Sequence, residues 1–270
     1  MRILKGGIAF FDSGIGGLTV LAECQKHLPN EIFYYFGDNR HAPYGNRSPK
    51  TIRKLVNRAV KKLLRCKIKA LVLACNTATA VCVEELRKKY DFPIIGAEPA
   101  LLKAVKRGNR VFVLSTRATY ESERFQKLCV KAKKREPTSR VSAYPCEELA
   151  GAIEKNIFRS GVDFTPLLPK GSPSAVVLGC THYIYIKEQI QTFYDCEVFD
   201  GNEGIAKRLE WKLEQKSPKD RDGRPPVTPS VNHTPKKGKS GLKKQTVFFL
   251  GSRKKHNKHV FEQMFVKSRK

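Results

Sequence analysis

The sequence predicts an α/β protein of two similar lobes, each with a mainly parallel sheet flanked by helices, related by a pseudo-two-fold axis and enclosing a candidate active site in the cleft between them. Short apolar runs alternate with longer amphipathic stretches along the chain, which is typical of parallel sheets covered by helices on both faces. A strand-to-cysteine junction occurs twice, as LVLACNT near residue 75 and as VVLGCTH near residue 180. This repetition indicates two lobes with a related layout.

The alternating pattern assigns each element to a lobe. Strands are expected over 8–11, 32–36, 70–73, 94–95, 110–114, 142–143, 175–178, 197–199 and 246–251. Helices are expected over 18–27, 49–66, 78–90, 100–106, 119–133, 147–157, 183–193, 204–214 and 259–265. Residues 216–244 are rich in Pro, Gly, Ser and Lys, which predicts a basic flexible loop. We expect residues 1–98 and 208–270 to form the first lobe and residues 99–207 to form the second.

The formal net charge of +27 is high for 270 residues. Residues 212–270 carry seventeen Lys and Arg against four Asp and Glu. A nucleic-acid partner, bound through phosphate neutralisation, is one interpretation. The interpretation we favour is a solvated basic surface that also attracts anionic metabolites, because no arginine-aromatic stripe or nucleic-acid motif accompanies the charge.

Other features of the composition restrict the class of protein. No run approaches the roughly 18 apolar residues of a membrane span, and the N-terminal stretch MRILKGGIAFFDSG is too short and interrupted for a signal peptide, so we expect a cytoplasmic protein without membrane contact. The eight cysteines include no C-x-x-C pair. Most of them are therefore expected to be small buried apolar residues rather than a disulfide framework or metal ligands.

The two cysteine junctions carry the strongest functional signal. Cys75 comes 63 residues after Asp12, and Cys180 comes 64 residues after Thr116, and each of these polar positions follows a predicted strand. Ligands bind at the carboxyl ends of parallel strands in open α/β sheets, so facing lobes would bring both thiols to one cleft. A thiol before a helix has its thiolate stabilised by free backbone N–H groups and by the helix dipole. One such cysteine would suggest a structural residue, but two at equivalent positions favour a function.

Polar side chains accompany both thiols. Asn76, Thr77 and Thr181 offer hydrogen-bond donors for a carboxylate or an oxyanion, and His182 is placed to orient or protonate a reacting group. The order of the glycines in FDSGIGG does not match the G-x-G-x-x-G nucleotide fingerprint, because position 19 is Thr. A dinucleotide cofactor is therefore not expected.

Two loops are predicted to border the same cleft. In FDSGIGG, Asp12 and Ser13 end a strand, and the following glycines would let the backbone approach a ligand closely; a strand-to-helix turn capped by Asp12 or Ser13 is the alternative. In YFGDNRHAPYGNRS, Tyr44 and Gly45 are placed to hold a substrate carboxylate through backbone N–H groups, and an ordinary turn is the alternative.

Six motifs in this order and spacing resemble those of the glutamate racemases, within the aspartate/glutamate racemase superfamily. They are FDSGIGG, GDNRHAPYGNRS, LVLACNTATA, IIGAEPA, STRAT and VVLGCTHY, and the resemblance covers residues 8–211 and 246–265. It implies interconversion of L- and D-glutamate without a cofactor or metal, with D-glutamate supplied for peptidoglycan. It also implies a homodimer.

The resemblance assigns roles to individual residues. It implies that Cys75 and Cys180 are two catalytic bases, one removing the α-proton and the other returning a proton to the opposite face, assisted by Asp12, His182 and Glu154. The assignment of Glu154 depends on the short match LAGAIE, and a carboxylate on a helix surface is its alternative. Arg117 and Thr119, in STRAT, are expected to have a structural or lid role. The implied substrate contacts are Asp12, Ser13, Tyr44, Gly45, Asn76, Thr77, Thr181 and His182.

Three other functions remain open. The first is a racemase of aspartate or of another amino acid in the same superfamily. The second is a racemase-like scaffold that binds nucleic acid through its basic surface. The third is a zinc protein using Cys180, His182, His256 and His259, although C-x-H and H-x-x-H match known ligand spacings poorly.

Overall fold

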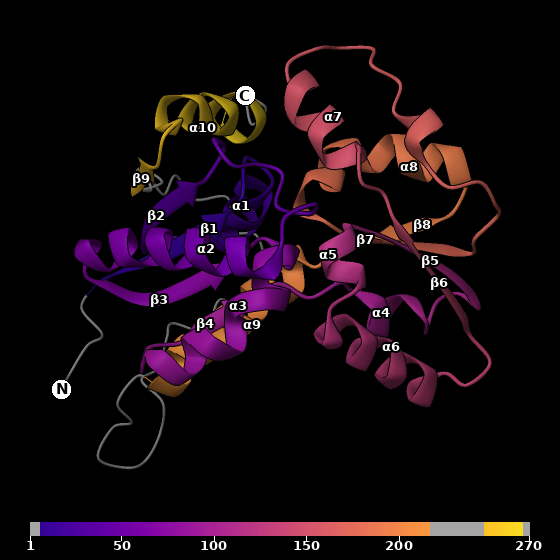
Figure 1. Cartoon of the computed structure of the whole chain (residues 1–270), viewed down its shortest axis with the longest axis horizontal. Helices are drawn as coiled ribbons and strands as arrows, with labels where there is room; N and C mark the ends of the chain where they lie inside the picture. Colours follow the sequence, from indigo (N-terminus) through magenta and orange to yellow (C-terminus); the bar gives the residue numbers. More distant parts are fainter. Residues whose placement is uncertain (1–5, 217–245, 267–270) are drawn as a thin grey trace, which may run out of the picture.

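The strands of the computed structural model, which describes residues 6–216 and 246–266, form two separate sheets (Figure 1). The five-stranded sheet has the order β4-β3-β1-β2-β9, and the four-stranded sheet has the order β6-β5-β7-β8. All neighbouring strands pair in parallel. The prediction of an α/β fold with two mainly parallel sheets is confirmed.

The elements follow one another in alternation. The strands are β1 (Gly7–Asp12), β2 (Ile32–Gly37), β3 (Ile68–Leu73), β4 (Ile94–Gly96), β5 (Arg110–Ser115), β6 (Arg140–Pro145), β7 (Ala175–Gly179), β8 (Glu197–Phe199) and β9 (Thr246–Leu250). The α-helices are α1 (Gly17–His27), α2 (Pro49–Leu63), α3 (Asn76–Lys89), α4 (Leu101–Ala104), α5 (Arg117–Tyr120), α6 (Glu123–Arg135), α7 (Leu149–Asn156), α8 (Lys187–Tyr194), α9 (Asn202–Lys216) and α10 (Lys254–Phe261). The short helices are η1 (Leu64–Cys66), η2 (Thr165–Leu167), η3 (Thr181–Ile186) and the π-helical η4 (Glu262–Val266).

The internal repeat predicted from the cysteine junctions is visible in the strand order. The strands β4-β3-β1-β2 of the first sheet correspond in order to β8-β7-β5-β6 of the second. Cys75 follows β3 and Cys180 follows β7, so both thiols follow equivalent strands. The first sheet has one additional strand, β9, which pairs with β2. The lobe boundaries at residues 98 and 208 stay predictions, and the basic segment 216–244 lies outside the described residues except for its first residue.

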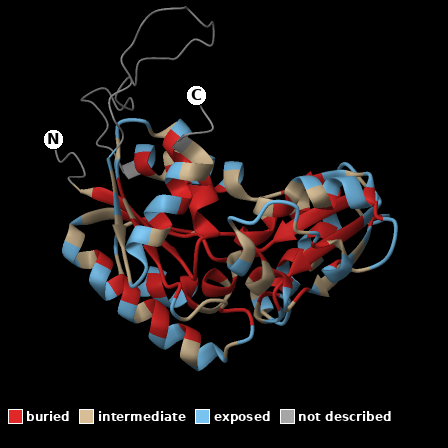
Figure 2. Cartoon of the chain, turned by 90° about the horizontal axis from the view of Figure 1, so that it is seen from above, coloured by how far each residue is buried: buried red, intermediate tan, exposed pale blue. Residues whose placement is uncertain are grey.

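Helices cover both faces of each sheet because side chains of successive strand residues point to opposite faces. In β1, Ile8 and Phe10 pack with α1, α9 and α10, whereas Ala9 and Phe11 pack with α2 and α3. In the second sheet, one face packs against α7 and α8 and the other against α4 and α6. Buried residues accordingly concentrate in the strands and on the inward sides of the helices (Figure 2).

Helix capping explains one difference from the predicted elements. The single helix expected over 119–133 is two helices, α5 and α6, because two caps lie within this stretch. The Thr116 side chain accepts a hydrogen bond from the backbone N–H of Thr119 and starts α5, and the Ser122 side chain accepts one from Phe125 and starts α6.

Two other helices also differ from their predicted form. The helix expected over 183–193 begins as the 3-10 helix η3 before it continues as α8. The helix expected over 259–265 starts earlier, as α10, and ends in the π-helical turn η4. Among the described helices, none combines the length and the apolar character that a membrane span needs. All eight cysteines are free, and five of them are buried.

Candidate active site

Cys75 and Cys180 line one small cavity at the carboxyl ends of the two sheets. Its volume, about 10 Å³ for the centre of a water-sized sphere, suffices for about one water molecule. The structure therefore brings the two repeated junctions together. The residues that line the cavity are Ser13, Pro43, Tyr44, Gly45, Cys75, Asn76, Thr77, Thr116, Ala150, Cys180, Thr181 and His182.

Cys75 occupies the N-cap of α3. The backbone N–H of Ala78 donates a hydrogen bond to its Sγ at 3.4 Å. Burial nevertheless raises the pKa of the Cys75 thiol to about 12, and the negative charge of Asp12 adds to this effect, while hydrogen bonds from Ala78 and Ser13 act in the opposite direction. The stabilisation predicted at the helix N-terminus is present, but desolvation outweighs it.

Cys180 has a different environment. It precedes η3, a six-residue 3-10 helix, and its side chain accepts no capping hydrogen bond. Both thiols therefore lie at a helix N-terminus, as predicted, but only Cys75 accepts a hydrogen bond there. Its polar neighbour is His182, whose Nδ1 lies 3.8 Å from the sulfur.

His182 and Glu154 form a short hydrogen-bonded pair behind Cys180. Burial alone lowers the pKa of His182, but hydrogen bonds to Cys180 and Glu154 outweigh burial and raise this pKa well above its ordinary value. Burial raises the pKa of Glu154, but the hydrogen bond and positive charge of His182 outweigh it and lower that pKa. Because the Glu154 side chain is only 16% exposed, the alternative of a surface carboxylate is wrong. Both shifts favour the charged forms of the pair, an imidazolium and a carboxylate, and therefore favour a positive charge beside Cys180.

Asp12 joins the two lobes. Its Oδ1 accepts a hydrogen bond from the backbone N–H of Gly14 at 2.9 Å, and its Oδ2 accepts one from the Thr181 hydroxyl at 3.1 Å. The carboxyl group is completely buried. Burial raises the pKa of Asp12, while the positive charge of His182 acts in the opposite direction.

The glycines of FDSGIGG allow contact between the lobes. A Cβ at Gly14 would lie 2.9 Å from Oε1 of Glu154, and a Cβ at Gly16 would lie 2.8 Å from the backbone nitrogen of His182. Both distances are shorter than real Cβ contacts. The sequence predicted a close approach to a ligand at these positions, but it is the second lobe that approaches them.

The loop after β2 covers the cavity, as its sequence suggested. The Tyr44 hydroxyl donates a hydrogen bond to Asp38 at 2.7 Å, which leaves the Tyr44 backbone and ring to face the cavity. The carbonyl of Gly45 accepts a hydrogen bond from the backbone N–H of Ala118 at 3.2 Å. A Cβ at position 45 would lie 2.7 Å from Cβ of Thr116. The loop is thus in direct contact with the second lobe.

A cluster of threonines from both lobes lies beside the cavity. The hydroxyls of Thr77 and Thr116 lie 2.8 Å apart, and the hydroxyl of Thr119 lies 3.3 Å from that of Thr77. Asn76 begins α3, and its buried Oδ1 has no hydrogen-bond partner among the described residues. Arg117 points away from the cluster, is more than half exposed and pairs with Glu147 and Glu121. The structural or lid role expected for Arg117 and Thr119 stays a prediction.

Two polar residues beside the site were missed as site residues. Thr116 lines the cavity, and the side-chain amide of Asn39 donates a hydrogen bond to Glu154 Oε1 at 2.9 Å. The repeat signals Thr116, because this residue directly follows β5 as Ser13 directly follows β1. Only proximity in sequence to Asp38, at the end of a strand, signals Asn39.

The residues named for a zinc site do not come together. His256 and His259 pack against the ring of Phe158, with ring centroids 5.9 Å and 5.1 Å from it, while Cys180 contacts His182. Within residues 6–216 and 246–266, no group of three or more potential metal ligands occurs.

Comparison with known proteins decides the family. The family model for Asp/Glu/Hydantoin racemases matches residues 19–209. The chain belongs to this family. Members of the Asp/Glu/Hydantoin racemase family that resemble it include a glutamate racemase of Clostridium novyi, which is 42% identical over 225 residues, covering 79% of this chain and 85% of the relative.

Solved racemase structures share the fold. Escherichia coli glutamate racemase, in complex with L-glutamate and the activator UDP-MurNAc-ala, is 30% identical with a TM-score of 0.71, covering 79% of this chain and 84% of that one. Francisella tularensis glutamate racemase, in complex with D-glutamate, is 27% identical with a TM-score of 0.71, covering 97% and 94%. As a member of this racemase family, the chain is an isomerase.

Proposed function

We propose that this racemase interconverts L- and D-glutamate by proton transfer between Cys75 and Cys180, without a cofactor. The observation that carries the proposal is the single cavity in which the two thiols, from equivalent strand ends of the two sheets, face the same small space. The similarity to glutamate racemases supports the choice of substrate. From the same resemblance we infer that the D-glutamate serves peptidoglycan synthesis. The expected homodimer stays a prediction.

The two sulfurs have opposite roles in the resting enzyme. His182, whose pKa is raised well above its ordinary value, lies beside Cys180, whereas burial raises the pKa of Cys75 to about 12 and favours the thiol. The Cys180 thiolate takes the α-proton, and the electron pair of the C–H bond remains on the substrate as a carbanion. The Cys75 thiol then donates its proton to the opposite face of that carbon. The opposite enantiomer reacts with the roles exchanged.

The α-proton is weakly acidic, so several effects must lower the barrier together. The cavity is nearly dry, which strengthens charge interactions, and its hydroxyl and amide donors are held in place before the reaction. Asp12 is one of the groups that raise the pKa of Cys75. A substrate ammonium group beside Asp12 would offset that charge and lower the pKa of Cys75. Donors for the carboxylates are Ser13, Gly45, Asn76, Thr77 and Thr181.

Substrate entry requires movement, because glutamate is far larger than the water-sized cavity. The hydrogen bonds between the lobes, from Thr181 to Asp12 and between Thr77 and Thr116, involve the lining residues Thr77, Thr116 and Thr181. We infer that they open for substrate entry and that closure around glutamate excludes water.

The test is exchange of the glutamate α-hydrogen in D₂O by the purified chain without pyridoxal phosphate, with both enantiomers of aspartate in parallel. Because enantiomers have equal free energies, kcat/KM must remain equal in the two directions in every variant. Cys75→Ser and Cys180→Ser should each lower it by at least about a hundred-fold. The two variants should differ in the α-deuterium isotope effect. This effect should rise for one direction of racemisation in Cys75→Ser and for the opposite direction in Cys180→Ser.

Cys66→Ser is the matched control, because Cys66 ends η1 outside the cavity. It should racemise glutamate as the wild type does. Activity retained in the double variant Cys75→Ser/Cys180→Ser would reject the two-thiol mechanism. Turnover of aspartate in preference to glutamate would reject the substrate.

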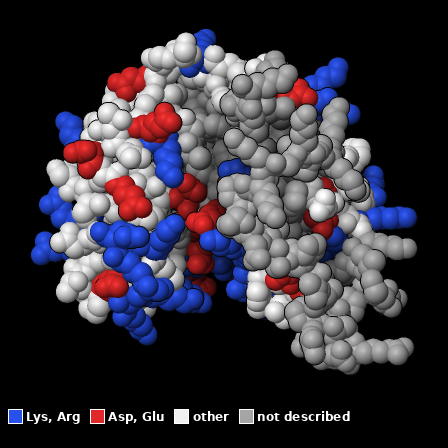
Figure 3. Space-filling model, turned by 180° about the vertical axis from the view of Figure 1, so that it is seen from behind, with Lys and Arg blue, Asp and Glu red and all other residues white. Residues whose placement is uncertain are grey.

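A second candidate function is binding of nucleic acid by the outer face of α2. Lys54, Arg58, Lys61, Lys62 and Arg65 line a shallow hollow of about 480 Å³ on this face. None of them has an acidic partner in the described part of the chain. On the face seen from behind, by contrast, Asp and Glu lie among the Lys and Arg (Figure 3).

The apolar side of α2 favours nucleic acid over a membrane as the partner. This side is buried in the core, so the helix has no apolar surface to insert into lipid. The cations extend over about 16 Å of helix, at a rise of about 1.5 Å per residue, and are suited to a run of phosphates. The buried apolar residues of α2 are Ile52, Leu55, Val56, Ala59, Val60 and Leu63.

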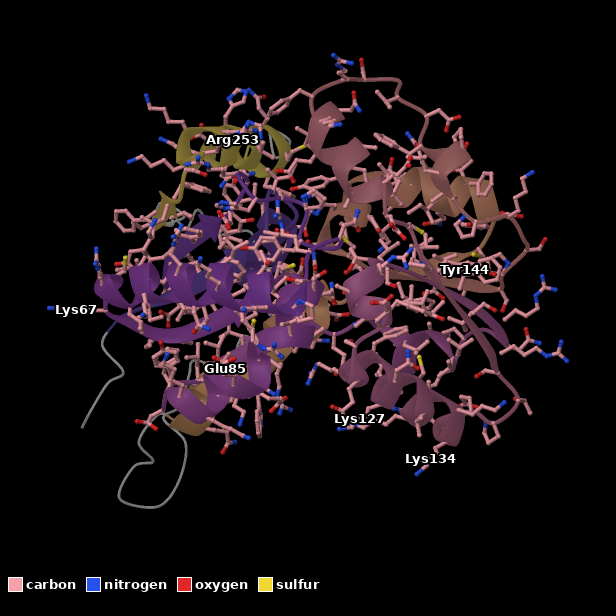
Figure 4. The ribbon with its side chains drawn as sticks, in the orientation of Figure 1. Lys67, Glu85, Lys127, Lys134, Tyr144 and Arg253 are labelled. Carbon is pink, nitrogen blue, oxygen red and sulfur yellow. The ribbon has the colours of Figure 1, made fainter. Side chains whose placement is uncertain are left out.

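Fluorescence anisotropy with a labelled DNA duplex tests this function. For about four phosphate contacts, affinity should fall about a hundred-fold between 50 and 200 mM salt. Arg58→Gln/Lys61→Gln should weaken binding, whereas the matched variant Lys127→Gln/Lys134→Gln, on α6 of the other lobe (Figure 4), should not. Equal weakening by both variants would indicate bulk charge rather than a site on α2, and absence of binding would reject the function.

A further inference from the structure

We propose that Asn39 is a positioning residue for this reaction, because its side-chain amide holds the Glu154 carboxylate against His182. The proposal goes beyond the proposed glutamate racemase function and rests on it. The Glu154–His182 pair would then be complete only when the two lobes are in contact.

The two oxygens of Glu154 have partners in different lobes. The amide nitrogen of Asn39, in the loop after β2, donates to Oε1 at 2.9 Å, and His182, in η3, bonds to Oε2. The backbone N–H of Ile15 also donates to this carboxylate. Without the amide of Asn39, the Glu154 carboxylate loses the side-chain donor that fixes its rotation about the Cγ–Cδ bond. A rotated carboxylate aligns less well with His182, which in turn contacts Cys180.

The setting of Asn39 differs from that of an asparagine that only stabilises a turn. Such a residue usually bonds to backbone groups about two residues away. Asn39 is 7% exposed and bonds to a side chain 115 residues away. Its placement depends on close packing, because a Cβ at Gly37 would lie 2.9 Å from Asn39 Oδ1.

Asn257, in α10, lies beside Gly37, two residues before Asn39. Asn257 is completely buried, and neither polar atom of its side chain has a hydrogen-bond partner among the described residues. A Cβ at Gly37 would lie 2.5 Å from Nδ2 of Asn257 and 2.9 Å from Oδ1 of Asn39. Two buried amides therefore lie beside Gly37, and Asn39 Oδ1, like the amide of Asn257, has no hydrogen-bond partner among the described residues.

The hydrogen bond also has an electrostatic consequence. Burial raises the pKa of Glu154, and the hydrogen bonds from His182 and Asn39 lower it. Removal of the Asn39 amide should therefore raise the pKa of Glu154 and weaken the support that keeps His182 protonated. The titratable groups that interact with Glu154 are Asp12, His182, Tyr35, Tyr185 and His256.

The experiment compares Asn39→Ala and Asn39→Asp with the wild type. Asn39→Ala should lower kcat/KM for glutamate by about ten- to a hundred-fold, with most of the loss in kcat, because hydrogen bonds to charged groups are among the strong ones. The acidic limb of its pH profile should move to higher pH. Asn39→Asp keeps the shape, loses the donor and adds a like charge, so it should be more impaired than Asn39→Ala.

Asn57→Ala is the matched control. The side-chain amide of Asn57 donates to Glu85 at 3.3 Å on the surface of the same lobe, so this variant loses the same type of contact away from the cavity. It should leave kcat/KM and the pH profile unchanged. The titration of His182, followed by NMR in each variant, is a measurement that does not depend on activity: the pKa of His182 should fall in Asn39→Ala and stay constant in Asn57→Ala.

The outcomes separate this inference from the proposed function. If the wild type racemises glutamate and Asn39→Ala matches it in kcat/KM and pH profile, the positioning role is overturned and the proposed function stands. If activity falls only in proportion to loss of folded protein, with the pKa of His182 unchanged, Asn39 is merely structural and the inference is overturned. If the wild type does not racemise glutamate, the proposed function fails, and an unchanged pKa of His182 in Asn39→Ala would reject the positioning role as well.

Discussion

Replacement of Gly16 tests whether the two lobes dock as closely during turnover as they do in this structure. Gly16 is the N-cap of α1 and has helical dihedral angles, φ −57° and ψ −39°, which alanine adopts without strain. Considered locally, Gly16→Ala should stabilise the chain by about 0.5–1 kcal/mol, because alanine loses less backbone entropy on folding than glycine does.

The second lobe reverses this expectation. A Cβ at position 16 would lie 2.8 Å from the backbone nitrogen of His182 and 2.8 Å from Cβ of Thr181, whereas ordinary van der Waals contact begins at 3.4 Å. The start of η3 must therefore retreat by about 0.6 Å, and misplacement by about 1 Å in an active site costs about a hundred-fold in rate. We expect Gly16→Ala to lower kcat/KM for glutamate by about ten- to a hundred-fold while the chain remains folded.

The assay follows the optical rotation of one pure enantiomer, with thermal unfolding measured on the same samples. Gly204→Ala is the matched control, because Gly204 lies in α9 and a Cβ there would meet nothing within 4 Å. It should raise the free energy of unfolding by about 0.5–1 kcal/mol and leave kcat/KM unchanged. Wild-type turnover by Gly16→Ala would show that catalysis does not need η3 this close to α1, and the reasoning would be wrong.

Three other measurements address single contacts in the site. Tyr44→Phe should lower the free energy of unfolding by about 1–3 kcal/mol in urea denaturation, because the buried Asp38 loses its hydroxyl donor, while KM for glutamate stays constant; a changed KM with unchanged stability would contradict this. The Cys75 thiol should resist iodoacetamide at about pH 8 without substrate, because a pKa of about 12 leaves little thiolate; peptide mass spectrometry that finds Cys75 alkylated first would refute it. Pairing with Glu154 should make the wild type more stable than His182→Gln. This difference in unfolding free energy should be fully present below about pH 6.5 and be lost as pH rises through the raised folded pKa of His182. A difference that grows with pH would oppose this reasoning.

Much of the fold could be predicted from the sequence because most of the strands are buried on both faces. Such strands appear as continuous apolar runs, and every predicted run overlaps an observed strand, for example 175–178 within β7. Helix ends were predicted less well, because local caps decide them. Ser122 divides the helix expected over 119–133, since its side chain bonds to the backbone N–H of Phe125. The spacing of apolar residues in the sequence cannot reveal a single hydrogen bond of this kind.

The candidate site was predictable where its residues follow strands. Cys75 and Cys180 could be recognised because the carboxyl ends of parallel strands meet at one edge of a sheet, and the structure places them on one cavity. Asn39 could not be recognised in this way. Its partner Glu154 is on a helix of the other lobe, and no local pattern records a contact between residues 115 positions apart.

The order of residues by itself determined two repeated sheets and a thiol at an equivalent strand end of each, because side-chain periodicity and strand position are local properties of a chain. Only the tertiary structure decided the surroundings of each sulfur, because burial and Asp12 raise the pKa of Cys75 while the Glu154–His182 pair lies beside Cys180, and packing brings these groups together from distant positions in the sequence. The contact between the lobes also explains why positions 14 and 16 are glycine: Glu154 and His182 occupy the space that a Cβ would need.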